Sequence, residues 1–413
     1  MEKMQLNNSL SAAYFNSSKF KTEKFSVYFY LPLEKQTVAP LCLLTALLPD
    51  GCEGFKKPVD ISRECDRLYG AGVSSEAAKL SDMLMIHFSV NCLADKYAGE
   101  PISKDAQKLL LDIIFSPSFD KENFENEKRL QLDEIDALIN DKRAYARAKC
   151  NEVMFKGEDF SIILPGSKED MQKVTLEDIK RAHTYLLENS YVHISLNSNQ
   201  KDERLFKEVE NRLKKYDRGN ALTKSISKPL KFTDEVQNIT EKLPIKQGKL
   251  VLGFKNKVSG SDAQTYKTMV MCDLLGGGTY SLLFSNVREK MSLCYYCAAK
   301  ANRRKGVLTV DSGVEFDNIE KTKNAVLEQL ETLKSGKVDE SALISSKKAL
   351  TQSLEGISDS QTVTERFYAD RLFDEDILSP AELCEKINSV TKQDVTDAAN
   401  NLVLDTVYTL TEE

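Results

Sequence analysis

The two halves of the chain repeat the same order of short segments at nearly the same spacing. Phe119-Asp120 precedes a polar helical stretch, and Val338-Asp339 precedes a similar stretch 219 residues later. Val174 begins VTLEDI, and its counterpart VTKQDV begins at Val390, 216 residues later. Two matched pieces at almost one offset indicate an internal duplication. We therefore predict two similar domains, residues 1–220 and 221–413, which fits a length of 413 residues.

Hydrophobic periodicity predicts that strands and long helices mix within each half. In both VTLEDI and VTKQDV a Thr precedes an Asp by three residues, which is close to a capping box. Helices packed beside strands in hairpin order predict an α+β fold, in which each domain has an antiparallel-rich sheet with helices on one face. The predicted strands are Phe25–Leu31, Met83–Val90, Tyr191–Leu196, Lys249–Phe254, Cys294–Ala299, Gly306–Val314 and Thr406–Leu410. The predicted helices are Ser103–Phe115, Lys121–Asn140, Ala263–Leu275, Ile319–Leu333 and Glu340–Glu355.

Composition and charge exclude several classes of partner. The formal net charge of −6 gives no sign of a basic binding surface, so we expect no nucleic-acid partner. The longest apolar run, Leu41–Leu48, is too short to cross a bilayer, so we expect no membrane partner. The first residues contain no apolar signal segment, and nine cysteines are scattered without a framework. These features predict a cytoplasmic protein with reduced thiols.

Three consecutive glycines, Gly276, Gly277 and Gly278, interrupt the second half. They are expected to end the helix before them, and Thr279 or Ser281 can cap a new helix that ends near Arg288. By themselves these residues fit a simple joint between helices with surface charge. A phosphate-binding loop is excluded, because no Lys-Ser or Lys-Thr pair follows the glycines.

This segment resembles the insulinase/pitrilysin-type metallopeptidase family, in its processing-peptidase-like branch. The matching residues are Gly277-Gly278, Ser281, Leu283-Phe284, Val287-Arg288-Glu289-Lys290, Leu293 and Tyr295. Ser292 stands where the family usually has a Gly before the Leu. Fainter similarity extends over Leu68–Val73, Phe119–Ala148 and Leu164–Ile179. The resemblance implies two similar α+β domains joined by a linker, which agrees with the duplication.

Active members of that family bind zinc through a helical H-x-x-E-H motif and a distant Glu. This chain has three histidines, His87, His183 and His193, and no two of them are four residues apart. By the family's spacing the motif falls near Leu43–Leu48, where we expect a buried apolar helix segment without metal ligands. Glu127 and Glu134 match the family's paired glutamates and are interpreted as vestigial. We expect no metal, no other cofactor and no catalytic residue.

Cys294 and Cys297 form a lone C-x-x-C, a spacing that also occurs in metal and redox sites. On a regular strand residues i and i+3 face opposite sides, so ordinary thiols are expected.

The resemblance implies a noncatalytic subunit of a heterodimeric zinc peptidase. Its partner is a paralogue that carries H-x-x-E-H, or a second copy of this chain, and its substrate is an extended peptide. Arg288 and Tyr295 match a pair that contacts the substrate backbone from the zinc-free half. The alternatives are a stand-alone peptide-binding or scaffold protein, and a peptidase with unusual ligands. The resemblance also includes zinc-free bacterial members linked with modification of elongation factor P.

Overall fold

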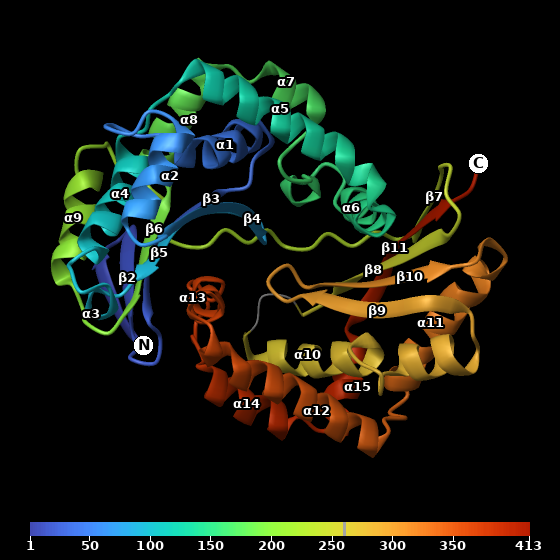
Figure 1. Ribbon diagram of the computed structural model, residues 1–413. Helices are drawn as coiled ribbons and strands as arrows, with labels where there is room; N and C mark the ends of the chain where they lie inside the picture. The colour runs from blue at the N-terminus through green and yellow to red at the C-terminus, as the bar shows by residue number, and fades with distance from the viewer. Residues whose placement is uncertain (259–261) are drawn as a thin grey trace. The chain divides into compact units, whose positions relative to one another are not determined.

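The computed structural model of the protein describes residues 1–258 and 262–413 (Figure 1). The chain divides into two compact units, each built from three separate stretches of sequence. The first unit contains Met1–Asp136, Ile162–Ile226 and Gln361–Phe373, and the second contains Ala137–Ser161, Ser227–Ser360 and Asp374–Glu413. The expected halves, residues 1–220 and 221–413, remain a prediction about the duplication. In the compact units, residues 137–161 of the first half belong to the second unit, and residues 361–373 of the second half belong to the first unit.

The first unit is built on a six-stranded sheet in the order β1-β2-β6-β3-β5-β4. Its strands are β1 (Glu2–Asn7), β2 (Leu10–Asn16), β3 (Thr22–Pro32), β4 (Gly72–Leu80), β5 (Met83–Leu93) and β6 (Tyr191–Ser198). Its helices are α1 (Lys35–Leu47), η1 (Leu48–Asp50), α2 (Pro58–Arg67), α3 (Asp95–Ala98), α4 (Ser103–Phe115), α5 (Lys121–Ala137), α7 (Lys168–Lys173), α8 (Leu176–Asn189), α9 (Glu203–Leu213) and α13 (Gln361–Ala369).

The second unit is built on a five-stranded sheet in the order β7-β11-β8-β10-β9. Its strands are β7 (Gln237–Lys242), β8 (Gly248–Asn256), β9 (Cys294–Asn302), β10 (Val307–Val314) and β11 (Leu402–Thr411). Its helices are η2 (Leu138–Asn140), α6 (Lys142–Met154), η3 (Asp159–Ser161), α10 (Asp262–Gly276), η4 (Leu283–Lys290), η5 (Phe316–Asn318), α11 (Ile319–Lys334), α12 (Glu340–Glu355), η6 (Gly356–Asp359), α14 (Pro380–Ser389) and α15 (Lys392–Asn400).

The two sheets have the same topology. If β1 is set aside, the order β2-β6-β3-β5-β4 matches β7-β11-β8-β10-β9 strand by strand. In both sheets the first pair is parallel, β2 with β6 and β7 with β11, and the remaining pairs are antiparallel. Thr175 and Thr391 cap the equivalent helices α8 and α15, each in a capping box with an Asp three residues later. The predicted α+β fold with two similar domains is confirmed.

One face of each sheet carries the main helix layer, as predicted. In the first unit α1, α4 and α8 pack on this face, and in the second unit α10, α11 and α15 do so (Figure 1). The predicted helices Ser103–Phe115 and Glu340–Glu355 have the predicted bounds. The predicted strands all form, most of them longer than predicted, whereas β10 begins one residue later than predicted. The strands β1, β2, β4 and β7 were not predicted.

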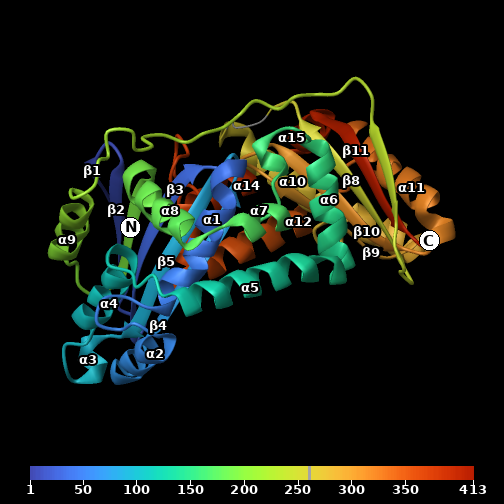
Figure 2. The same ribbon diagram turned by 90° about the horizontal axis from the view of Figure 1, so that it is seen from above.

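The opposite face of each sheet is covered by a helix that comes from the other half of the sequence. In the first unit α13 packs on β3 and β6. In the second unit α6, which follows α5 and η2 along the chain (Figure 2), packs on β8 and β11. The two helices hold equivalent places in the repeat, because α6 follows α4 and α5 as α13 follows α11 and α12. None of the helices in the described ranges has the length and apolarity that a membrane crossing requires.

Candidate functional site

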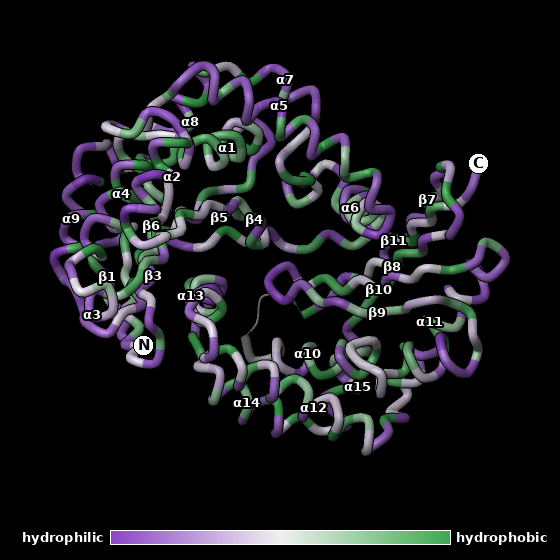
Figure 3. Tube along the Cα trace, viewed as in Figure 1, coloured by the Kyte–Doolittle hydropathy of each residue, from purple (hydrophilic) through white to green (hydrophobic). Residues whose placement is uncertain are grey.

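The place where the resemblance puts the zinc motif is part of the hydrophobic core. Leu43, Leu44, Leu47 and Leu48 are each at most 1% exposed, and they belong to the core cluster of the first unit. The hydropathy colouring shows α1 as an apolar helix (Figure 3). The one hydroxyl in the segment, on Thr45, donates to a backbone carbonyl one turn earlier, at 2.7 Å. The prediction of a buried apolar helix segment is confirmed.

Glu127 and Glu134 lie on α5 and act electrostatically on residues of α1 and η1. Burial raises the pKa of Asp50 to about 7, with the charge of Glu127 as the second cause. Burial likewise raises the pKa of Cys42 to about 12, with Glu134 as the second cause. Glu127 is half-buried, and burial raises its own pKa, whereas Glu134 is exposed and accepts a hydrogen bond from Gln131 at 3.3 Å.

This donor set does not fit a zinc ion. Structural and catalytic zinc sites take three or four ligands, mostly His and Cys, at about 2.0–2.3 Å. Across residues 1–258 and 262–413, no three His, Cys, Asp or Glu side chains gather as metal ligands would. Each of the three histidines has another neighbour: His87 lies beside Glu365 at 3.6 Å, His183 is bonded to the Ile114 carbonyl at 2.7 Å, and His193 is bonded to Ser11 at 2.8 Å.

The glycine-rich segment Gly276–Gly278 joins α10 to η4 in the second unit. A Cβ atom at Gly276 would lie 2.5 Å from the backbone nitrogen of Ala299 on β9, so only glycine allows this approach. The amide of Gly277 donates to a carbonyl of α10 at 2.7 Å, and the carbonyl of Gly278 accepts from Ser281 at 3.0 Å. The hydroxyl of Ser281 in turn accepts from the Phe284 amide at 3.4 Å, so Ser281 caps η4. The glycines therefore have a packing role at the joint.

Arg288 lies on η4, which has the wide hydrogen-bond spacing of a π-helix. The Met291 amide bonds to the Asn286 carbonyl five residues earlier, at 2.9 Å. Such turns are rare and often lie at functional sites. The Arg288 side chain is 41% exposed, its guanidinium lies 4.7 Å from the centre of the Phe284 ring, and its Nε is 3.7 Å from Glu289. Most of its donors are therefore open to a ligand.

Tyr295 lies on β9, at the free edge of the second sheet. The register of β9 with β10 shifts at this point, because Gly313 pairs with Tyr296 while Val314 pairs with Cys294. Tyr295 is the extra residue of this β-bulge and is 56% exposed. Its hydroxyl donates to the Glu315 carboxylate, and this bond raises the pKa of Tyr295. The turn before the strand contains Ser292 at φ +51°, in the left-handed region where the family's glycine fits without strain.

Tyr295 and Glu315 form an exposed polar group at the start of β9, and Arg288 lies on η4, which packs on β9. Glu315 was not predicted, and no motif signalled it, because it follows β10 in sequence and joins the group only through the pairing of β9 with β10. The group offers hydrogen-bond donors and one carboxylate acceptor, which suits the N–H and C=O groups of a peptide backbone.

The bulge also changes the orientation of the two nearby cysteines. Cys297 pairs with Ser312 and Cys294 with Val314, so both thiols lie on the same face of the sheet. The prediction that they face opposite sides was wrong, because the extra residue of the bulge resets the alternation. A hydrogen bond from Cys297 is the main cause that lowers the pKa of Cys294 to about 7.

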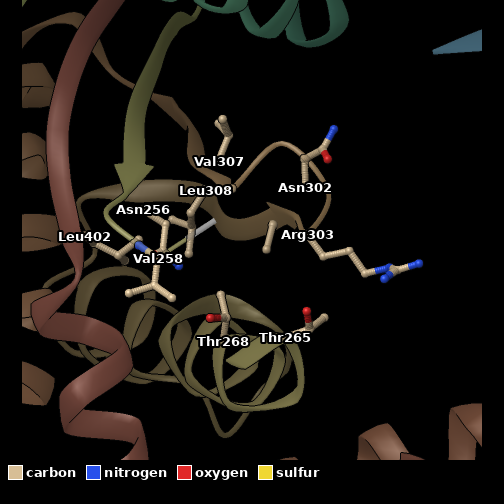
Figure 4. A pocket seen from close by; sticks show the side chains of 11 residues that line it. Asn256, Val258, Thr265, Thr268, Asn302, Arg303, Val307, Leu308 and Leu402 are labelled. Atoms are coloured by element: carbon tan, nitrogen blue, oxygen red, sulfur yellow. Dashed lines mark hydrogen bonds between the residues drawn. The ribbon is translucent and has the colours of Figure 1, made fainter. Parts of the chain in front are cut away.

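A separate small pocket lies near the other end of β9 (Figure 4). Asn256, Thr268, Asn302 and Leu402 are among the side chains that line it. Figure 4 shows the Arg303 side chain pointing away from the pocket, and its guanidinium pairs with Asp374 at 2.8 Å. The pocket does not include the exposed group around Arg288 and Tyr295.

Comparisons with known proteins agree with these observations. Residues 173–350 match the family model of the Peptidase M16 inactive domain. The chain is 28% identical over 416 residues to the probable inactive metalloprotease YmfF of Bacillus subtilis (strain 168), covering 97% of this chain and 95% of that protein. It is 24% identical over 306 residues to the uncharacterized zinc protease YmxG of the same organism, covering 71% and 73% of the two chains. A crystal structure of a conserved protein from Enterococcus faecalis V583 has the same fold, with a TM-score of 0.90 at 24% identity over 100% of this chain and 98% of that one.

Proposed function

We propose that the chain is an inactive homologue of the M16 peptidases, the insulinase/pitrilysin-type family, and that it is the noncatalytic subunit of a heterodimeric zinc peptidase. The catalytic subunit is a paralogue that carries the H-x-x-E-H motif. This chain helps to enclose an extended peptide and to position it for cleavage in the partner. A homodimer of this chain is the state expected when no partner is present.

One contrast supports this proposal above all. The helix that would hold zinc is packed with leucines at most 1% exposed, whereas Arg288 and Tyr295 remain exposed on η4 and the β9 bulge. Two exposed donors beside a strained turn cost stability and contribute little to the core of the unit. Their value is therefore expected in recognition of a ligand.

The proposed ligand contact uses the peptide backbone. Arg288 and the Tyr295 hydroxyl donate hydrogen bonds to a peptide carbonyl near the scissile bond, where negative charge develops during hydrolysis by the partner. Glu315, which accepts from Tyr295, orients the phenol and can accept a backbone N–H. The rest of the extended peptide is held by β-augmentation on a sheet edge of the partner's first domain.

Co-expression with an H-x-x-E-H relative from the same genome tests this proposal. Sedimentation velocity should show a one-to-one heterodimer, and fluorescence anisotropy with a labelled extended peptide should show tighter binding to the pair than to either chain. A chain that forms no complex and binds the peptide equally well alone would instead be a peptide-binding or scaffold protein. A chain that binds neither the paralogue nor the peptide would contradict the proposal.

We also propose that the heterodimer works in the cytoplasm. All nine cysteines are free thiols, which is the usual state in a reducing compartment. Fractionation of cells that express the tagged chain at native level checks this expectation, and recovery in an exported fraction would contradict it.

A further inference from the structure

The two cysteines at the start of β9 have the arrangement of an attacking and a resolving thiol. The bulge at Tyr295 places Cys294 and Cys297 on the same face of the sheet, against Val314 and Ser312 of β10. Cys294 is half-buried, whereas Cys297 is only 7% exposed. Cys294 is therefore the more accessible residue of the two.

Three groups around Cys294 favour its thiolate. Cys297 and Ser312 lie beside Cys294 on the same face of the β9–β10 pair, and the positive charge of Arg288 is close enough to act on the Cys294 sulfur. Burial opposes ionisation, but together these groups lower the pKa of Cys294 to about 7. At that value about half of the side chain is thiolate near neutral pH, and the thiolate is the nucleophile in disulfide exchange.

The other cysteines of the chain have the opposite character. Five of them, Cys42, Cys52, Cys92, Cys150 and Cys272, are buried, and burial raises the pKa of each thiol. Cys65 and Cys384 are half-exposed like Cys294, yet burial also raises the pKa of both. These two residues are matched internal controls, because they share the exposure of Cys294 and lack its neighbours.

We propose that Cys294 and Cys297 form a redox-active dithiol, which a low-molecular-weight disulfide converts into a disulfide bond across the β9 bulge. The Cys294 thiolate attacks one sulfur of the small disulfide, a protein–small-molecule disulfide forms, and one small thiolate leaves. Cys297 then loses its proton and attacks the Cys294 sulfur, which releases the second small thiolate. The small disulfide is thus reduced to two thiols while the two protein thiols are oxidised to one disulfide. This inference does not depend on the proposed function.

Oxidised glutathione is a suitable probe of the full-length chain. Samples are quenched with an alkylating agent over time, and peptide mass spectrometry reports the state of Cys294, Cys297, Cys65 and Cys384. In the wild type we expect Cys294 to react at least about tenfold faster than Cys65 and Cys384, because its thiolate fraction is larger. The final product should be a peptide that contains the Cys294–Cys297 disulfide.

Three variants separate the roles of the residues. Cys297→Ser should accumulate the glutathione adduct on Cys294, because the resolving thiol is missing. Cys294→Ser should leave Cys297 reduced, and Arg288→Gln should slow the reaction of Cys294 near neutral pH. Circular dichroism and a urea titration of each variant check that the fold is retained. The proposal is overturned if Cys294 reacts no faster than Cys65 and Cys384, or if its glutathione adduct persists in the wild type.

Discussion

Glu365 is the most constrained charged residue of the first unit. It lies on α13, is 1% exposed, and accepts a hydrogen bond from Tyr28 at 2.6 Å. His87 lies 3.6 Å from one of its oxygens and Lys24 lies 3.7 Å from the other. Burial alone would raise the pKa of Glu365, but the neighbouring His87 imidazole and the charge of Lys24 outweigh burial and hold the pKa below its ordinary value. The carboxylate is therefore the charged anchor that joins α13 to its sheet.

Replacement of this carboxylate should destabilise the first unit. Glu365→Gln removes a charge-assisted hydrogen bond inside the core, at a cost of about 1.5–3 kcal/mol in free energy of unfolding at neutral pH. Because the folded pKa is lowered, the stabilisation is complete above pH 4.5 and is lost as the pH falls through the folded value. Urea titrations at falling pH should show the wild type approaching the variant, with the exposed Glu355→Gln as control. If the difference in free energy of unfolding between the wild type and Glu365→Gln does not shrink on acidification, the role of Glu365 as a charged anchor is contradicted.

The helices α1, α6 and α13 contribute to the hydrophobic cores of the two units. The α1 helix is apolar along the stretch that would carry zinc ligands, so it serves the core. The α6 helix buries Ala146, Cys150 and Met154 with Val251 and Tyr408 of the second sheet. The end of α13 and the turn after it add Ala369 and Leu372 to Tyr28, Tyr30 and Met85 of the first sheet. Each sheet is therefore covered on both faces.

The α1 helix should tolerate neither the shortening of a buried leucine side chain nor the introduction of metal-ligand side chains. Leu44→Ala should lower the free energy of unfolding by about 2–5 kcal/mol, the usual cost of a cavity at a buried leucine. The triple variant with His at Leu44 and Leu48 and Glu at Leu47 restores the H-x-x-E-H order but places polar groups in the core. Urea titration and elemental analysis should show an unstable chain without stoichiometric zinc. A folded triple variant that binds one zinc and cleaves peptides would contradict this account of α1.

Most of the fold could be predicted from the sequence, because the strands and helices have clear periodic patterns. The strands β1, β4 and β7 were missed, since they lie at sheet edges and their partly exposed residues are polar or short. The strand β2 was also missed, although it lies inside the first sheet and is mostly buried. The helices α6 and α13 were not predicted, and even an apolar stripe would show only that a helix packs, without identifying the sheet it covers. Arg288 and Tyr295 were found from the motif around them. Glu315 and the common face of Cys294 and Cys297 depend on the β9–β10 register, which a single sequence does not reveal.

At the scale of the whole molecule, neither sequence half is a complete folding unit. Residues 1–226 lack α13, and residues 227–413 lack α6, so each half leaves one sheet face uncovered. The face under α13 contains Tyr28, Tyr30 and Met85, all at most 1% exposed in the whole chain. Uncovering such a face creates an apolar patch that favours association.

The placement of α13 in the first unit and of α6 in the second predicts how fragments of the chain behave. Residues 1–226 expressed alone should bind the dye ANS and unfold at lower urea concentration than the first unit of the intact chain. A fragment that joins residues 361–373 to residues 1–226 through a flexible linker should recover part of the loss, and the same linker with Glu365→Gln should recover less. Equal stability of residues 1–226 with and without the α13 segment would contradict the structural role of this placement.

The turnover of the zinc-bearing partner tests most directly whether this chain is a noncatalytic subunit that positions a peptide. The measurement is kcat for an extended peptide in the assembled pair, with wild-type chain, Arg288→Ala or Tyr295→Phe. Matched controls are Arg63→Ala and Tyr97→Phe, which alter exposed residues of the first unit. We predict that Arg288→Ala and Tyr295→Phe leave assembly intact and lower kcat by roughly 10²–10³, the usual effect of losing one donor to a developing oxyanion. An unchanged kcat in a fully assembled, active pair would contradict the proposed role of both residues.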